Sequence, residues 1–266
     1  MSVNKEIIGP LFDGNDKVAI AIARIRQFTP PEGLYVAFSG GKDSVVLLDL
    51  VRKAGVKHDV HYNLTTVDPP ELVHFIRKEY PDVQVHRPAM SMWQLIVKKK
   101  YPPTRMVRYC CEVLKERGGN ELLRTVATGV RWSESPGRRK RWRGMVQNCR
   151  NTIGKVYLMP IIDWTDDDVW YYIRSNNIKY CSLYDEGFKR LGCVMCPMTG
   201  GKYMQVEMKR WPKIAAAYKR AILKSWEVNN IGDFEGGKWT SGEDLWNWWI
   251  GNEEEDDDDS TPWLFE

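Results

Sequence analysis

The sequence predicts an α/β fold, in which a parallel sheet carries helices on both faces. Three observations lead to this prediction. β-rich apolar runs alternate with amphipathic stretches of helical period over residues 18–176, which is the pattern of βαβ units. Two adjacent glycines connect the first strand to a helix within residues 39–44. The chain has 266 residues and 43% hydrophobic content, which is enough for a substantial core.

The predicted elements follow one another along the chain. Residues 18–28 form an amphipathic helix, which the sequence TPPEG ends before the first strand. Thr165, followed by three acidic residues, caps the helix after the last strand. A long helix over residues 203–227 is interrupted at Pro212. The five predicted strands are residues 34–38, 57–64, 83–87, 124–130 and 155–162.

The chain is predicted to have three parts. Residues 1–170 form the α/β domain, residues 171–250 form a cysteine-bearing, helical and Trp-rich region, and residues 251–266 form an acidic tail. The seven carboxylates of residues 253–259 contribute −7 to a net charge of +4, so the rest carries about +11. So basic a body predicts a polyanionic partner, either nucleotides or a nucleic acid. The tail is most simply a solvated segment.

The given sequence shows no pattern typical of a signal peptide or a membrane-spanning helix. The beginning of the chain, MSVNKEIIGPLFDGNDK, has no apolar region like that of a signal peptide, and no apolar run reaches the ~18 residues of a membrane span. We therefore expect a cytoplasmic protein without membrane contact. In a reducing compartment, cysteines are more often ligands or catalysts than disulfide partners.

The sequence YVAFSGGKDSVVLLDL places small and charged residues between a strand and a helix. Its glycines let backbone N–H groups converge, the helix N-terminus adds partial positive charge, and Lys42 adds a full one. The GxxxxGK spacing of a Walker loop is absent. We interpret the loop as a phosphate cradle; an ordinary turn capped by Ser44 is the alternative. The cradle consists of Ser39, Gly40, Gly41, Lys42, Asp43 and Ser44.

Two cysteine pairs have the spacing of metal ligands: Cys110 with Cys111, and Cys193 with Cys196. A C-x-x-C loop directs two thiolates at one metal or cluster, and the second pair completes four-fold ligation. Zinc and a [4Fe–4S] cluster both accept four cysteines, and a redox dithiol is a third option. Spacing alone does not choose between zinc and the cluster.

A basic segment, TGVRWSESPGRRKRWR at residues 128–143, follows the fourth strand. Arginine presents a planar fork suited to phosphate or sulfate, and Trp132 and Trp142 are placed to stack on bases. A solvated basic loop is the alternative. Because the segment follows a strand at the edge where the cradle opens, we expect anion binding. The candidate residues are Gly129, Arg131, Ser133 and Glu134, followed by the basic run from Arg138 to Arg143.

The motifs SGGKDS, YCCEVLK, GVRWSES and GCVMCP occur in this order, and residues 34–198 resemble the phosphoadenosine phosphosulfate (PAPS) reductase family of PP-loop enzymes. The resemblance implies a Rossmann-like, adenine nucleotide alpha hydrolase-like sheet whose loop binds the phosphates of an adenine nucleotide. The cysteine arrangement looks like the [4Fe–4S] ligation of adenylyl-sulfate reductases. Carried over, it makes Cys110, Cys111, Cys193 and Cys196 the cluster ligands.

Two features differ from the reductases of this family. Those enzymes attack the sulfate sulfur with a cysteine near the C-terminus, and no cysteine follows Cys196 in this sequence. The intact SGGKDS looks more like the loop of enzymes that cleave ATP between the α- and β-phosphates. That group includes the small ATP sulfurylase subunit, the tRNA thiolases and the cluster-bearing DNA phosphorothioation enzymes. The resemblance therefore favours ATP-dependent sulfur transfer.

In this hypothesis the cradle holds the β,γ-pyrophosphate of ATP, Mg²⁺ neutralises the leaving group, and Asp43 helps to position the ion. An acceptor oxygen is adenylated and sulfur then displaces AMP, arriving through the cluster, Cys149 or Cys181. The last two cysteines have no partner in sequence and are otherwise small buried hydrophobes. Arg131 and the basic run bind a polyanionic acceptor, with DNA and tRNA as candidates. The expected catalytic residues are Lys42, Asp43 and Arg131.

Two alternatives stay open. The first is thiol-dependent reduction of adenylyl sulfate or PAPS to sulfite, in which another cysteine or a partner supplies the nucleophile. The second is a binding module that senses the nucleotide and uses its metal structurally. The partners suggested by the resemblance are a sulfur-donor protein such as a cysteine desulfurase, a thioredoxin-like reductant, and a second copy of the chain in a homodimer.

Overall fold

The structure is a computed structural model that describes residues 16–115, 124–141, 144–148, 155–229 and 239–251. The chain forms two compact units. Unit 1 comprises Met1–Asn63, Glu71–His86 and Arg117–Glu186, and unit 2 comprises Leu64–Pro70, Arg87–Glu116 and Gly187–Glu266. The units therefore interleave along the chain, and the predicted division at residue 170 stays a prediction. The predicted acidic tail lies outside the described residues from residue 252 on.

Unit 1 contains a six-stranded sheet with the strand order β3-β2-β1-β4-β6-β5. Neighbouring strands run parallel except β5 and β6, which are antiparallel. The strands are β1 (Leu34–Ala37), β2 (His58–Asn63), β3 (Gln84–His86), β4 (Thr125–Ala127), β5 (Val146–Asn148) and β6 (Val156–Leu158). Five of them lie inside the five predicted ranges, so the predicted Rossmann-like α/β fold is confirmed. The sequence does not predict β5.

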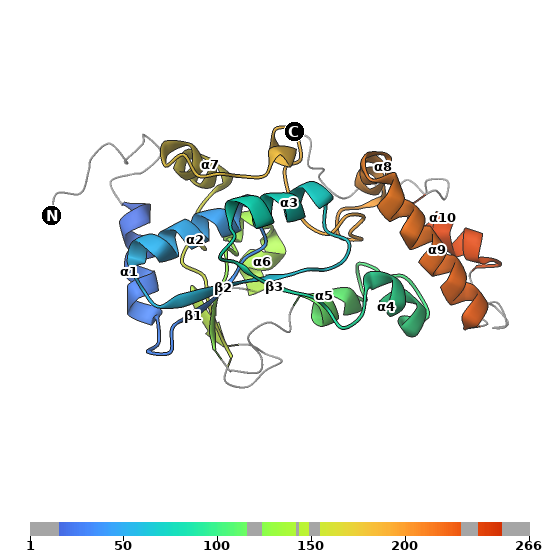
Figure 1. Cartoon of the computed structure of the whole chain (residues 1–266), viewed down its shortest axis with the longest axis horizontal. Helices are drawn as coiled ribbons and strands as arrows, with labels where there is room; N and C mark the ends of the chain where they lie inside the picture. The colour runs from blue at the N-terminus through green and yellow to red at the C-terminus, as the bar shows by residue number, and fades with distance from the viewer. Residues whose placement is uncertain (1–15, 116–123, 142–143, 149–154, 230–238, 252–266) are drawn as a thin grey trace. The chain divides into compact units, whose positions relative to one another are not determined.

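Helices of unit 1 pack around α2, which follows the cradle. Val46, Leu47, Leu48 and Leu50 of this helix are fully buried, as expected for a helix that is apolar on most sides. α2 packs against both α1 and α7, and Figure 1 shows α2 and α3 along the same side of β2. The helices are α1 (Lys17–Phe28), α2 (Lys42–Ala54), α3 (Pro70–Glu79), α6 (Pro136–Arg141) and α7 (Asp166–Ser175).

The predicted cap of α7 is confirmed. The Thr165 hydroxyl accepts from the Asp168 N–H at 3.2 Å, and the Asp168 carboxylate accepts from the Thr165 N–H at 2.8 Å. This reciprocal pair is a capping box, which satisfies two N–H groups at the helix start. It fixes where α7 begins, and therefore fixes Asp166 in its first turn.

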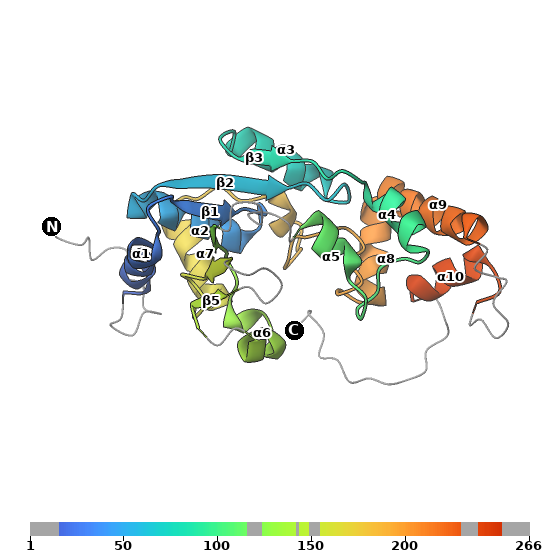
Figure 2. The ribbon, with the colours of Figure 1, turned by 90° about the horizontal axis from the view of Figure 1, so that it is seen from below.

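Unit 2 is helical in its described part, and Figure 2 shows α4, α8, α9 and α10 gathered around one another. α9 packs against α4, α8 and α10. Pro212 is the first residue of α9, where its missing N–H costs nothing, so the predicted interruption is confirmed. The helices are α4 (Met92–Lys99), α5 (Tyr109–Leu114), α8 (Gly201–Arg210), α9 (Pro212–Val228) and α10 (Gly242–Trp249). Within the described ranges, no helix combines the length and apolar character that crossing a membrane requires.

Candidate functional site

The predicted cradle, residues 39–44, lies at the carboxyl end of β1. Gly40 has a left-handed φ of +74°, and a Cβ there would lie 2.8 Å from side-chain carbons of Leu72 and Ile76. Both facts favour glycine. The buried Ser44 hydroxyl donates to the Gly41 carbonyl at 2.8 Å and accepts from the Ser39 N–H at 3.2 Å. Ser44 thus holds the loop closed from inside.

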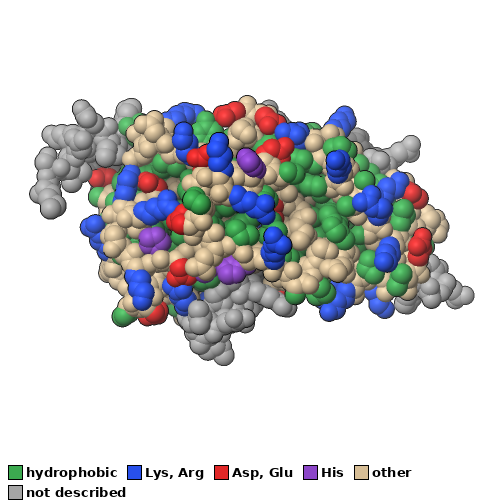
Figure 3. Space-filling model, in the orientation of Figure 1, with side chains coloured by type: hydrophobic (Ala, Val, Ile, Leu, Met, Phe, Trp, Pro, Cys, Tyr) green, Lys and Arg blue, Asp and Glu red, His purple; other side chains and the backbone are tan. Residues whose placement is uncertain are grey.

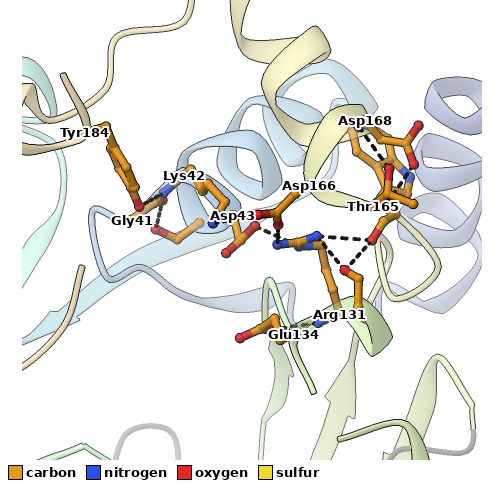
Figure 4. Close-up of polar contacts among 12 residues, drawn as sticks. Gly41, Lys42, Asp43, Arg131, Glu134, Thr165, Asp166, Asp168 and Tyr184 are labelled. Carbon is orange, nitrogen blue, oxygen red and sulfur yellow. Dashed lines mark hydrogen bonds and ion pairs between the residues drawn. The ribbon is translucent and has the colours of Figure 1, made fainter. Parts of the chain in front are cut away.

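Lys42 is buried at the N-terminus of α2, where Figure 4 shows it between Tyr184 and Asp166. Its backbone N–H donates to the Tyr184 hydroxyl at 2.8 Å, and its Nζ lies 3.7 Å from Asp166 Oδ2. Burial raises the pKa of Tyr184, so the phenol stays protonated. A neutral oxygen therefore occupies the acceptor position at this helix N-terminus, which is where oxyanions bind in other proteins.

The Arg131 guanidinium joins two carboxylates and is only 1% exposed. Its Nε donates to Asp43 Oδ1 at 2.8 Å, and its Nη2 donates to the Asp166 carboxylate. Its Nη1 donates to the Trp164 carbonyl at 3.2 Å. Since these donors point at protein groups, the geometry makes Arg131 a positioning residue. Its expected contact with an acceptor stays a prediction.

The other candidate residues of the basic segment support this arrangement. The Ser133 hydroxyl accepts from Arg131 Nη1 at 2.7 Å, and Glu134 Oε1 accepts from the Arg131 N–H at 3.0 Å. Gly129 follows β4, and a Cβ there would lie 2.9 Å from the backbone carbon and oxygen of Asp43. Glycine at this position lets the end of β4 approach the first turn of α2 closely.

Two cations and the three carboxylates of Asp43, Glu134 and Asp166 meet in this cluster. Lys42 and Arg131 face the carboxylates of Asp43 and Asp166. Desolvation raises the pKa of Asp43, while the neighbouring Lys42 and Arg131 act in the opposite direction. Asp166 is exposed, and is therefore the member of the cluster that moves most easily into solvent.

Sequence reasoning did not identify Tyr184 and Asp166 as site residues. Asp166 follows β6, a parallel strand whose carboxyl end lies at the same edge as the cradle, and this position is a signal that points to it. Tyr184 lies in a loop-rich stretch, in the short 3₁₀ helix Ser182–Tyr184, where no periodicity distinguishes it.

The structure brings all four predicted ligand cysteines together in unit 2, where they line one small cavity. All five described cysteines are free. The ranges that the structure describes contain no group of three or more His, Cys, Asp or Glu side chains placed to hold a metal ion. The cavity lining consists of Cys110, Cys111, Cys193 and Cys196 together with Lys115, Met92, Pro103, Leu114, Pro197 and Tyr218.

Buried groups hold the C-x-x-C loop from behind. Met195 has a left-handed φ of +56°, and its N–H donates to Glu207 Oε2 at 2.6 Å. The Tyr218 hydroxyl donates to the Val194 carbonyl at 3.3 Å, and the Val194 N–H donates to the Val67 carbonyl at 2.8 Å. Glu207 is 6% exposed, and burial raises its pKa to about 7. The loop is thus shaped by its surroundings in unit 2.

Lys115, which the YCCEVLK motif contains but the predicted ligand set does not, is an exposed lysine that lines the same cavity as the four cysteines. The Cys193 sulfur raises the pKa of Lys115 through its negative charge. A hydrogen bond with Cys111 and burial together raise the pKa of Cys110. Lys115 therefore offsets negative charge that builds up on the cysteine sulfurs.

The remaining predicted cysteines lie outside the cysteine cavity or outside the described part of the chain. Cys181, in unit 1, is fully buried, and burial raises its pKa, so it is a neutral thiol. Cys149 and residues 142–143 lie outside the described residues. On the face of the molecule shown in Figure 3, Lys and Arg side chains are spread among acidic and hydrophobic ones.

Comparison with known proteins identifies the class to which this fold and loop belong. The family of the phosphoadenosine phosphosulfate reductase domain matches residues 33–199, which is more than half of the chain. The chain therefore belongs to this family, and the predicted resemblance is confirmed. The crystal structure of phosphoadenylyl-sulfate (PAPS) reductase from Candida auris, in complex with phosphate, has the same fold. It gives a TM-score of 0.50 at 20% identity and covers 73% of this chain and 97% of that one.

Two relatives show how widely the similarity extends. Adenosine 5'-phosphosulfate reductase 2 of Bacillus subtilis is 27% identical over 222 residues, 79% of this chain and 89% of that protein. An uncharacterized protein of Methanocaldococcus jannaschii is 30% identical over 254 residues, which are 90% of this chain. The chain spans only 50% of the length of that archaeal protein. The comparisons therefore show the family and the fold of this chain.

Proposed function

We propose that the chain is an ATP-dependent enzyme of sulfur chemistry, which cleaves ATP to AMP and pyrophosphate and so activates an acceptor for sulfur transfer. The observation that carries the proposal is the arrangement around Lys42 (Figure 4). A buried ammonium and a helix N-terminal N–H lie together, each held by an oxygen that a phosphate oxygen can replace. Family membership supports the nucleotide class.

Each residue of the cluster has a role in this reaction. Pyrophosphate oxygens take the positions of the Tyr184 hydroxyl and the Asp166 carboxylate beside Lys42, whose ammonium stabilises the charge on the leaving group. Asp166, displaced toward solvent, and Asp43 are then the carboxylates that would hold Mg²⁺ brought by the nucleotide. Arg131 keeps the Asp43 carboxylate in place.

The bond changes are those of adenylation followed by substitution. An acceptor oxygen forms a bond to the α-phosphorus, the bond from this phosphorus to the α,β-bridging oxygen breaks, and pyrophosphate leaves with the electron pair. A sulfur nucleophile then bonds to the acceptor atom that carried the oxygen, and AMP leaves with that oxygen. Lys42 stabilises the first leaving group only.

We propose further that Cys110, Cys111, Cys193 and Cys196 hold a [4Fe–4S] cluster. Four thiols around one cavity supply the ligand number that both a [4Fe–4S] cluster and zinc accept, and the resemblance of the cysteine pairs to those of adenylyl-sulfate reductases favours the cluster. Lys115 offsets the negative charge of the thiolates. When bound, the cluster supplies electron transfer or sulfur delivery.

The proposal is tested with protein purified without oxygen, which is supplied with Mg²⁺, sulfide as the sulfur nucleophile, ATP labelled at the α-phosphate, and mixed tRNA and DNA as acceptors. We expect labelled AMP and pyrophosphate, and a loss of about 100-fold or more in the Lys42→Ala variant. Lys78→Ala, which removes an exposed lysine of α3, is the matched control and should turn over as the wild type does. Undiminished turnover by Lys42→Ala, or formation of ADP in place of AMP, would contradict the proposal.

A second candidate is reduction of adenylyl sulfate or PAPS to sulfite by a thiol. It is favoured by the Bacillus subtilis relative, whose similarity extends over most of both chains. The same anaerobic protein is supplied with each sulfonucleotide and a thiol reductant, in the absence of ATP. Sulfite formation under these conditions would replace the first proposal with the second.

A further inference from the structure

We propose that residues 99–108 of unit 2, here called the basic tip, form a binding surface for a nucleic-acid strand. The inference rests on the proposed function, because it identifies the acceptor class of the same reaction. The tip joins the end of α4 to the start of α5, and therefore leads directly into Cys110 and Cys111.

The tip is held in a defined shape. The Tyr109 hydroxyl donates to the Tyr101 carbonyl at 2.6 Å, and the two rings form an edge-to-face pair with centroids 5.8 Å apart. The Thr104 hydroxyl accepts from the Val107 N–H at 3.0 Å. Trp249 Nε1 donates to the Pro103 carbonyl at 2.7 Å. These contacts hold the backbone of the loop in one conformation, and that conformation keeps its other side chains exposed to solvent.

The charge of the tip is of one sign. No acidic residue occurs in the sequence between Asp82 and Glu112. The Lys99 ammonium lies 5.9 Å from the centre of the Tyr109 ring, so the end of α4 and the start of α5 are neighbours. Figure 3 shows basic side chains along the lower edge of the molecule in the region where Figure 1 labels α4. The exposed cations of the tip are Lys99, Lys100, Arg105 and Arg108.

Apolar side chains lie among these cations. Met106 is 91% exposed, Val107 43% and Tyr101 37%. An apolar side chain flanked by arginines is what minor-groove-binding proteins insert between base steps, and an exposed tyrosine provides a stacking face for a base. Arginine, methionine and tyrosine also occur often at protein–protein interfaces, so it is the four cations without an acidic residue among them that favour a nucleic acid, whose phosphates they can contact, over a protein partner.

The inner side of the tip faces the cysteine site. Pro103 lines the same cavity as Cys110 and Cys193, while Met106 and Val107 project into solvent. Arg108 of the tip is only two residues before Cys110 in the sequence, so a strand that contacts Arg108 lies close to the cysteine site. That position suits an acceptor that must receive sulfur from this part of unit 2.

The test measures binding without ATP. Full-length protein is titrated into fluorescein-labelled tRNA, a DNA duplex and a single DNA strand at several salt concentrations, and anisotropy is recorded. We expect binding to at least one probe with a steep salt dependence, and an affinity about 10-fold or more lower for Arg105→Glu, with a smaller salt slope. Lys213→Glu, the same charge change at an exposed residue of α9, should bind as the wild type does.

Met106→Ala should weaken binding while leaving the salt slope unchanged, because it removes an apolar contact only. The proposal is overturned if the wild type binds none of the three probes at low salt, if Arg105→Glu binds normally, or if Lys213→Glu weakens binding equally. Binding of labelled thioredoxin that depends on Arg105, with no nucleic-acid binding, would also overturn it in favour of a protein partner. Lys42→Ala should retain nucleic-acid binding, which separates this result from the outcome of the ATP assay.

Discussion

The guanidinium of Arg131 holds the carboxylate of Asp43 at 2.8 Å and so links the end of β4 to the first turn of α2. The same guanidinium reaches Asp166 in the first turn of α7. Three segments that are distant in sequence are thus joined at the edge of the sheet by one buried cation. The position of both carboxylates beside Lys42 depends on this link.

Replacing Arg131 by Ala should destabilise the fold as well as the site. The substitution leaves the half-buried Asp43 with Lys42 as a neighbouring cation but without its hydrogen-bonded one, and breaking a buried ion pair from one side costs about 3 kcal/mol. Urea unfolding measures the loss as a lower transition midpoint. Arg24→Ala removes a two-bond arginine–aspartate pair at the partly exposed Asp163 and should cost less. An Arg131→Ala protein that unfolds at the wild-type urea concentration would contradict this account.

Gly129→Ala should impair the cradle through packing alone. The added Cβ would lie 2.9 Å from the backbone of Asp43, so the start of α2 must shift. We expect a loss of about 1–3 kcal/mol in stability and a raised KM for ATP. At Gly137 a Cβ would meet only Ser135 Oγ at 3.9 Å, so Gly137→Ala is the control. Equal kinetics and midpoints for the two variants would show that this close approach is unimportant.

Tyr184→Phe tests whether the phenol oxygen stands in for a ligand oxygen. The variant loses the acceptor of the Lys42 N–H, which should lower stability by about 1 kcal/mol. Because the nucleotide no longer has to displace that hydroxyl, ATP affinity should be equal to or higher than that of the wild type. Isothermal titration with a non-hydrolysable ATP analogue measures it. A strong loss of affinity would instead make the hydroxyl a direct ligand contact.

The sequence predicts the strands and the cradle because their signals are local. Apolar β-rich runs identify five strands, and the glycine pair between a strand and a helix identifies the loop. β5 has three residues at the edge of the sheet and no buried position, so neither length nor periodicity distinguishes it. The link from Arg131 to Asp43 and Asp166 cannot be read from spacing, since it forms only when three loops meet at one sheet edge.

In the cysteine site too, some features can be read from the sequence and others depend on tertiary contacts. The two pairs identify candidate ligands by spacing, and the fold brings them to one cavity. The support of the C-x-x-C loop comes from Glu207 on α8 and Tyr218 on α9. A glutamate within an amphipathic helix gives no sequence signal of burial, because charged residues are exposed in most helices.

Cysteine substitutions should separate ligands from bystanders. A [4Fe–4S] cluster provides about four iron and about four acid-labile sulfide ions per chain. A Ser substitution at any one of the four proposed ligands should lower both contents well below this value in anaerobically purified protein. The four ligands are Cys110, Cys111, Cys193 and Cys196. Cys181→Ala should retain both, because Cys181 lies in unit 1 and does not line the cavity. Zinc in place of iron in the wild type, or normal iron in all four variants, would contradict the cluster.

Glu207 should make the stability of unit 2 depend on pH. Burial raises its pKa to about 7 from a usual value of 4.5, so the folded state binds this proton more tightly than the unfolded state does. The stabilisation that this protonated group contributes is therefore full below about pH 4.5 and falls as the pH rises to about 7, by up to about 3 kcal/mol.

Glu207→Gln keeps an acceptor for the Met195 N–H but cannot ionise, so its urea midpoint should fall less than that of the wild type between pH 5 and pH 7.5. Glu243→Gln, at an exposed residue of α10, should retain the wild-type dependence. If the wild type and Glu207→Gln lose the same stability over this range, Glu207 is already ionised in the folded protein at pH 5. Neighbouring groups would then offset the desolvation of its carboxylate.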